Sequence, residues 1–94
     1  MKYIWYWEWS YKDREKETEL STKFEEALKK TPEKFPKMGK SCHTGRGKGF
    51  RLIEAENEEQ LTNLVGLWYP TENFKLVPYF YGSDLMGTVQ KWSE

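Results

Sequence analysis

The sequence predicts one α+β domain with the ferredoxin-like order strand, helix, strand, strand, helix, strand and a four-stranded antiparallel sheet. Three observations lead to this prediction. The 94 residues leave room for one hydrophobic core, strand and helix patterns follow each other in that order, and 17% of the residues are aromatic, which makes a small core dense. We expect residues 1–94 to form a single domain, with residues 83–94 as a C-terminal extension.

The first predicted elements are a strand over residues 3–9 and a helix over residues 15–30. The strand segment is rich in strand-forming aromatics and contains no breaker. In the helix segment the acidic beginning and the lysine-rich end suit the helix dipole. The apolar residues at one-face helical spacing are Leu20, Phe24, Ala27 and Leu28. Thr31-Pro32 is expected to end the helix.

A β-hairpin is predicted next, with a short strand over residues 37–44 and a clearer one over residues 50–55. The turn Gly45-Arg46-Gly47-Lys48-Gly49 joins them, and its glycines are expected to provide positive φ angles. The backbone N–H groups and cations of this turn also suit a phosphate or a carboxylate. The turn is neither a P-loop nor a dinucleotide-binding fingerprint, since it joins two strands.

The remaining chain predicts a second helix, a fourth strand over residues 73–81 and a short terminal helix over residues 83–92. Asn57 is expected to cap the second helix, with Gln60 as its capping-box partner, and Pro70 to end it. The apolar face of the second helix is predicted to consist of Leu61, Leu64, Val65 and Trp68. The terminal segment carries Leu85, Val89 and Trp92 at i, i+4 and i+7.

The ferredoxin-like order places the first and third strands at the centre of the sheet and the second and fourth at its edges. Pro78 in the fourth strand and Pro36 before the second favour edge positions, because proline cannot donate to a ladder. Lys37 and Lys40 would discourage further pairing along the second edge.

Composition excludes several classes of partner. Fifteen basic and fifteen acidic residues cancel, so we expect no nucleic-acid or anionic-membrane binding. Lys48-Gly49-Phe50 resembles the start of the third-strand motif of RNA-recognition motifs, but Arg51 and the residues after it depart from that pattern. A single cysteine, no signal peptide and no apolar run of membrane length predict a cytoplasmic protein.

His43 is the first candidate for acid–base chemistry, because it is the only histidine. A hydrogen-bonded histidine at a strand end, without catalytic duty, is the competing interpretation. Cys42 precedes it, but neighbours on a strand point to opposite faces, so the pair does not readily chelate one metal. No metal site and no cofactor are therefore expected, and no paired carboxylates or nucleophile elbow indicate a hydrolase.

Both faces of the first strand are apolar. One face carries Tyr3, Trp5, Trp7 and Trp9, and the other carries Ile4 and Tyr6. Two helices cover only one face of the sheet, so a homodimer closed through the other face is predicted, unless the terminal segment covers that face in its own chain. The candidate pocket residues are Trp5, Trp7, His43, Arg46, Arg51 and Tyr79, of which the two arginines are candidate anion contacts.

Three features together resemble a family of small prokaryotic proteins that is named as a domain of unknown function and grouped with the dimeric α+β barrels. These are Trp7-x-Trp9, His43 before the glycine-rich turn, and the run from Gly47-Lys48-Gly49-Phe50 into Leu52-Ile53-Glu54-Ala55. The resemblance covers about residues 1–81, with the segment from Gly82 as a departure. It implies a fold and a dimer, not an activity.

Three functions remain open from the sequence. The first is a homodimeric module that binds or senses a small organic molecule in an aromatic pocket. The second is a cofactor-independent monooxygenase-like or isomerase-like enzyme in which His43 exchanges a proton. The third is a protein–protein interaction module that uses the exposed strand surface.

Overall fold

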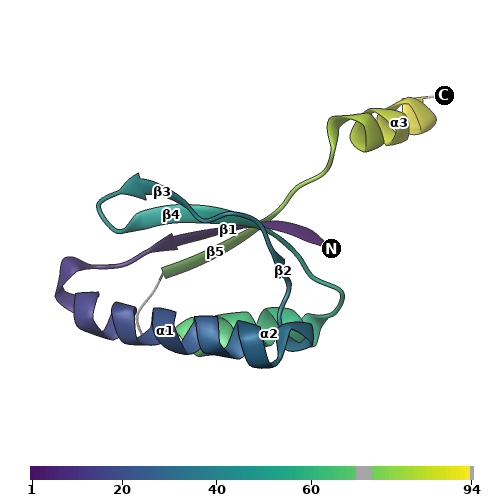
Figure 1. The fold of residues 1–94 in the computed structure, drawn as a ribbon. Helices are drawn as coiled ribbons and strands as arrows, with labels where there is room; N and C mark the ends of the chain where they lie inside the picture. Colours follow the sequence, from purple (N-terminus) through teal and green to yellow (C-terminus); the bar gives the residue numbers. More distant parts are fainter. Residues whose placement is uncertain (70–72, 94) are drawn as a thin grey trace.

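The computed structural model describes residues 1–69 and 73–93. An antiparallel sheet lies over α1 and α2, and α3 projects from one corner (Figure 1). The elements are β1 (Lys2–Glu8), the 3-10 helix η1 (Tyr11–Asp13), α1 (Arg14–Lys30), the 3-10 helix η2 (Pro32–Lys34), β2 (Lys37–Met38), β3 (Cys42–Gly45), β4 (Lys48–Glu54), α2 (Glu58–Trp68), β5 (Asn73–Pro78) and α3 (Gly82–Ser93).

The strand order is β2-β4-β1-β5, and β3 also pairs with β4. β1 and β4 are therefore central, β5 forms one edge, and β2 and β3 share the other edge. Among the described residues the sheet has five strands, so the prediction of four strands with one second strand over residues 37–44 is wrong.

An extra residue explains the split of the second strand. Met38 pairs with Ile53 and Cys42 pairs with Phe50. The four residue steps from Met38 to Cys42 therefore lie opposite only three residue steps along β4. A ladder cannot stay in register across such a bulge. The Gly39 N–H still donates to the Leu52 carbonyl at 2.8 Å, while the Gly39 carbonyl turns to the side chain of Arg51.

The two packed helices begin and end close to the predicted positions. α1 closes where the Thr31 N–H and hydroxyl both donate to the Ala27 carbonyl. At the start of α2 the Asn57 carboxamide oxygen accepts from the Gln60 N–H at 2.9 Å, which confirms the predicted cap. The predicted capping box is wrong in one contact. The side-chain oxygen of Gln60 accepts from the N–H of Glu56 and not from the N–H of the cap residue Asn57. Pro70 lies outside the described residues.

The odd-numbered face of β1 packs on the helices. Trp5 and Trp7 are buried there, whereas Tyr6 on the other face is 40% exposed. The buried hydrophobic cluster consists of Trp5, Trp7, Phe24, Phe35, Ile53, Leu64 and Trp68. The opposite face of the sheet, called the open face below, carries Ile4, Tyr6, Phe50, Leu52 and Val77.

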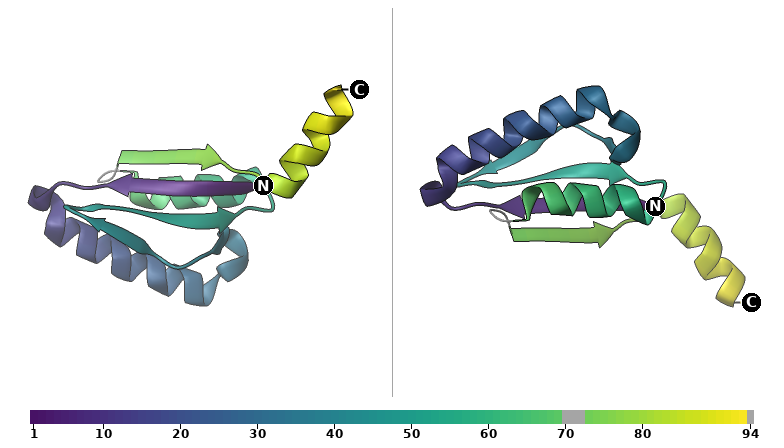
Figure 2. Two further views of the ribbon diagram at one scale, coloured as in Figure 1. Left: turned by 90° about the horizontal axis from the view of Figure 1, so that it is seen from above. Right: turned by 90° about the horizontal axis from the view of Figure 1, so that it is seen from below.

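The C-terminal segment is helical as predicted but does not fold back onto its own sheet. β5 ends at Pro78 instead of Tyr81, and α3 then leads away from the domain, as both views of Figure 2 show. Every described residue of α3 is exposed, including Trp92 at 83%. The possibility that this segment covers the open face of its own chain is therefore contradicted.

Candidate functional site

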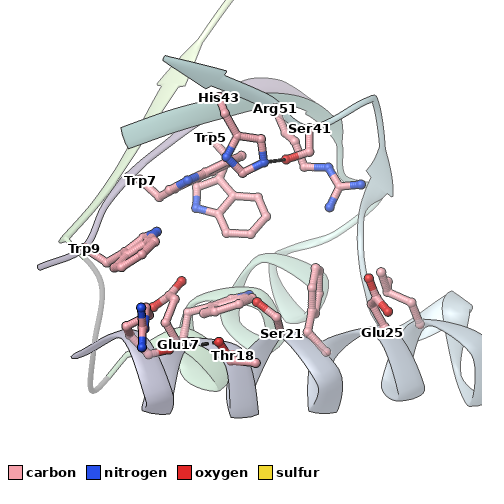
Figure 3. Close-up of a pocket in the computed structure, with 14 residues that line it drawn as sticks. Trp5, Trp7, Trp9, Glu17, Thr18, Ser21, Glu25, Ser41, His43 and Arg51 are labelled. Atoms are coloured by element: carbon pink, nitrogen blue, oxygen red, sulfur yellow. Dashed lines mark hydrogen bonds between the residues drawn. The ribbon is translucent and has the colours of Figure 1, made fainter. Parts of the chain in front are cut away.

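A cavity of about 450 Å³ lies between α1 and the side of the sheet formed by β1, β3 and β4. In Figure 3, Trp5, Trp7, His43 and Arg51 approach it from the sheet, and Glu17, Thr18, Ser21 and Glu25 approach it from α1. Trp9 lies at one end, and Arg51 faces Glu25 at the other. The size is in the range of pockets that hold small organic ligands.

Aromatic rings form the deep wall of the cavity. The ring centroids of Trp5 and Trp7 are 5.1 Å apart, and Trp5 lies 6.0 Å from Phe24 and 6.2 Å from Trp68. Tilted and edge-to-face pairs at these distances favour one arrangement of the rings. The wall is thus rigid and apolar, which suits a flat ligand.

Three buried polar atoms belong to residues that line this cavity and have no hydrogen-bond partner among the described residues. They are Nε1 of Trp5, Nε1 of Trp68 and Oε2 of Glu17. Glu17 is only 7% exposed. Each buried unsatisfied group costs about 1–3 kcal/mol, and all three atoms are shielded from solvent behind the cavity surface.

Arg51 brings a cation to the opposite end. Its Nε donates to the Gly39 carbonyl at 2.9 Å, so the strand bulge at Gly39 fixes the guanidinium. Burial lowers the pKa of Arg51 from its ordinary value, while the carboxylate of Glu25 acts in the opposite direction. A partly desolvated guanidinium gains more from an anion than a fully hydrated one.

His43 lies at the rim of the cavity. Its Nε2 is 3.1 Å from the Ser41 hydroxyl, and its ring meets Trp7 edge-on at 5.8 Å between centroids. Register explains this position, because His43 pairs with Gly49 and Gly49 pairs with Trp7, so the three residues form one row on the helix side of the sheet. Cys42 points the other way, as predicted, and it is exposed.

The glycines of the β3–β4 turn have two separate roles. Gly45 and Gly47 have φ angles of +93° and +74°, which confirms the predicted conformational role. Gly49 instead provides space, because a Cβ there would lie 2.5 Å from the Trp7 ring and 2.6 Å from the Cys42 carbonyl oxygen. The Trp7 ring therefore packs this close to the backbone of β4 only because Gly49 has no side chain.

The structure brings together four of the six predicted pocket residues. Trp5, Trp7, His43 and Arg51 line the cavity. Arg46 is exposed at the tip of the hairpin, and Tyr79 lies in a different depression beside Met1 and Tyr3. The sequence does not show which faces of different strands lie on the same side of the sheet. It therefore could not exclude Arg46 and Tyr79 from the predicted pocket.

Glu17, Ser21 and Trp68 line the cavity but were not predicted as site residues. From the sequence, Glu17 was interpreted only as part of the acidic beginning of the first predicted helix, which suits the helix dipole. It precedes Leu20 by three residues and Phe24 by seven, however, so the helical spacing places it on the inward face. That spacing is the signal that could have identified it.

Two features are absent from the described residues, 1–69 and 73–93. These residues contain no group of three or more His, Cys, Asp or Glu side chains placed to hold a metal ion. None of their helices combines the length and the apolar character needed to cross a bilayer.

Comparison with known proteins gives a family but no activity. No curated protein and no solved structure matches this chain. The family described as Domain of unknown function (DUF3303) matches residues 1–93. The match includes the segment from Gly82, so the prediction that this segment departs from the family is wrong. The chain belongs to the family Domain of unknown function (DUF3303).

Proposed function

We propose that the protein is a binding or sensing module whose cavity accepts a small aromatic organic molecule. The observation that carries this proposal is a cavity of ligand size that combines an aromatic wall with the partly buried guanidinium of Arg51. A ligand with an anionic group would pair with Arg51 and pack its ring against the tryptophans that line the cavity.

Isothermal titration calorimetry and thermal shift with indole, phenol, benzoate and 4-hydroxybenzoate test the proposal. A probe at about 100 times its Kd should stabilise the fold by about 2.7 kcal/mol. Ser21→Trp should abolish binding by filling the cavity, whereas Thr22→Trp, on the exposed side of the same helix, should not. The proposal fails if no probe binds, or if binding survives Ser21→Trp unchanged.

We propose further that two chains associate through their open faces, as in a dimeric α+β barrel of ferredoxin-like domains. Five apolar residues support this proposal, of which Leu52 is 46% and Tyr6 40% exposed, with the Tyr6 ring 6.2 Å from Phe50. A soluble monomer rarely keeps such a patch uncovered. α3 has its own uncovered apolar residues, which association with a partner chain would also bury.

Light scattering on the full-length protein and on a truncation after Tyr81 tests the association. We expect a dimer for the full chain at micromolar concentration, and a monomer after Leu52→Lys. A strictly monomeric full-length protein would refute the dimer and leave recognition of a different protein chain as the use of this surface.

A second candidate function is cofactor-independent catalysis, favoured by the position of His43 at the cavity rim beside Ser41. There the imidazole could exchange a proton with a ligand that the tryptophans enclose. His43→Gln should remove turnover and leave ligand affinity within about threefold, whereas full turnover in that variant would exclude this mechanism.

A further inference from the structure

We infer that the ligand of the cavity is an α-amino acid with an aromatic side chain. Its carboxylate would bind Arg51, and its ammonium group would bind Glu25. Its ring would extend from there toward Trp7 and Trp9. This inference rests on the binding function proposed above and names the class of ligand.

The formal charges that line the cavity cancel, counting His43 as neutral. The charged residues are Arg14, Glu17, Glu25 and Arg51. A ligand with a net charge would be attracted by one sign and repelled by the other. A ligand that carries one positive and one negative group can satisfy both signs.

Two of these charges are already engaged or shielded. The guanidinium of Arg14 donates to the Tyr11 hydroxyl at 3.1 Å and lies 5.1 Å from the centre of that ring. Glu17 is buried, and its Oε2 has almost no contact with solvent. Arg51 and Glu25 therefore remain as the charged pair that a ligand can reach.

Arg51 and Glu25 face each other at one end of the cavity without touching (Figure 3). The carboxylate of Glu25 raises the pKa of Arg51 against the effect of burial, which shows that the two charges act on each other. The single ion pair within 4 Å in residues 1–69 and 73–93 nevertheless joins Lys48 to Glu8. An amino acid carries both of its charged groups on one carbon atom, so it can bridge two side chains that do not meet. A carboxylate ligand without the ammonium group would instead face the carboxylate of Glu25.

Arg51 has uncharged neighbours on the sheet. It pairs with Trp5 on β1, and the register of the β3–β4 ladder places Ser41 on its other side. Its Nε donates to the Gly39 carbonyl at 2.9 Å, and its Nη groups make no hydrogen bond within residues 1–69 and 73–93. These Nη groups are left for a carboxylate, which guanidinium groups bind through charge-assisted hydrogen bonds.

The ring of the ligand has space toward the other end of the cavity. Trp7 and Trp9 continue along the sheet, away from the row of Arg51 (Figure 3). Ser21, four residues before Glu25 on α1, lines the cavity from the helix with a small side chain. Indoles on one side and a small residue on the other suit a flat aromatic ring.

Calorimetry on the full-length protein tests the inference with phenylalanine and two molecules that each lack one of its charged groups. We expect phenylalanine to bind about fivefold more tightly than 3-phenylpropionate, which has no ammonium group to pair with the exposed Glu25. We expect it to bind about tenfold more tightly than 2-phenylethylamine, which has no carboxylate to pair with the partly buried Arg51. Alanine, which has both charges and no ring, should also bind about tenfold more weakly. If 3-phenylpropionate or alanine binds as tightly as phenylalanine, the assignment of an aromatic amino acid is wrong.

Variants assign each charged group of the ligand to its side chain. Arg51→Gln should weaken the binding of phenylalanine about tenfold without weakening that of 2-phenylethylamine, which also shows that the variant is folded. Glu25→Gln should weaken phenylalanine binding about fivefold without weakening that of 3-phenylpropionate. Arg46→Gln and Glu26→Gln are the matched controls, because both residues are exposed and neither lines the cavity. A control that weakens phenylalanine binding as much as its partner variant would contradict the assignment.

Failure of this inference is distinguishable from failure of the proposed function. If indole or 3-phenylpropionate binds the natural protein but not Ser21→Trp, and phenylalanine binds no more tightly than 3-phenylpropionate, the binding function stands and the amino acid is wrong. If neither these molecules nor indole binds, both are wrong.

Discussion

Replacing Glu17 with methionine should make the unliganded protein more stable. The side chain is 7% exposed, and its Oε2 has no partner among the described residues, which costs about 1–3 kcal/mol. Methionine removes this cost and places apolar atoms beside Phe24. Glu17 also lies in the first turn of α1, where the loss of a favourable charge costs about 0.3–1 kcal/mol.

A matched control separates the two effects. Glu15 lies in the same first turn but is exposed, so Glu15→Met loses only the interaction with the helix dipole. We expect Glu17→Met to exceed Glu15→Met in unfolding free energy by about 2 kcal/mol. Urea and thermal unfolding followed by circular dichroism measure this difference, which corresponds to roughly 8–16 °C in Tm for a domain of this size. A Glu17→Met protein that is less stable than Glu15→Met would refute the reasoning that the buried Oε2 of Glu17 lowers the stability of the unliganded protein.

Two further predictions concern the support of the cavity. Gly49→Ala should destabilise the fold by about 1–3 kcal/mol, because the added methyl group would press on the Trp7 ring. Gly66→Ala should stabilise the fold by about 0.5–1 kcal/mol, because Gly66 lies inside α2 with open space around it. Equal effects of the two variants in chemical denaturation would contradict this prediction. Gln60→Ala should cost about 1–3 kcal/mol, since its buried amide bonds two backbone groups at 2.8 and 2.9 Å. Asn63→Ala, which loses a single bond, should cost less, and the reverse order would be inconsistent with the structure.

Local patterns in the sequence predicted most elements because each depends on neighbouring residues. The spacing of Leu20 and Phe24 predicted α1, and the Asn57 cap predicted the start of α2. The bulge at Gly39 could not be predicted, because it depends on how many residues β4 presents opposite it. The inward face of β1 could not be predicted either, since both of its faces are apolar.

The site was predicted only where a residue type is rare or strongly patterned. His43 and the tryptophans of β1 drew attention as the single histidine and an aromatic run, and the structure places them at one cavity. Arg51 reaches that cavity because β4 pairs it with Trp5, and Arg46 does not because the hairpin projects it outward. The importance of Glu17 depends on burial without a partner, which spacing alone does not show.

The most direct test of the proposed function is the response of the tryptophan indole N–H signals in a ¹H–¹⁵N correlation spectrum. The five tryptophans give five such signals, assigned by single Trp→Phe replacements. If the cavity binds a small aromatic molecule, at least one probe should shift the signals of Trp5 and Trp68 together and saturably. The signal of Trp92, which lies exposed on α3 away from the cavity, should stay in place. Unchanged Trp5 and Trp68 signals with every probe at millimolar concentration, or equal shifts at Trp92, would contradict the account.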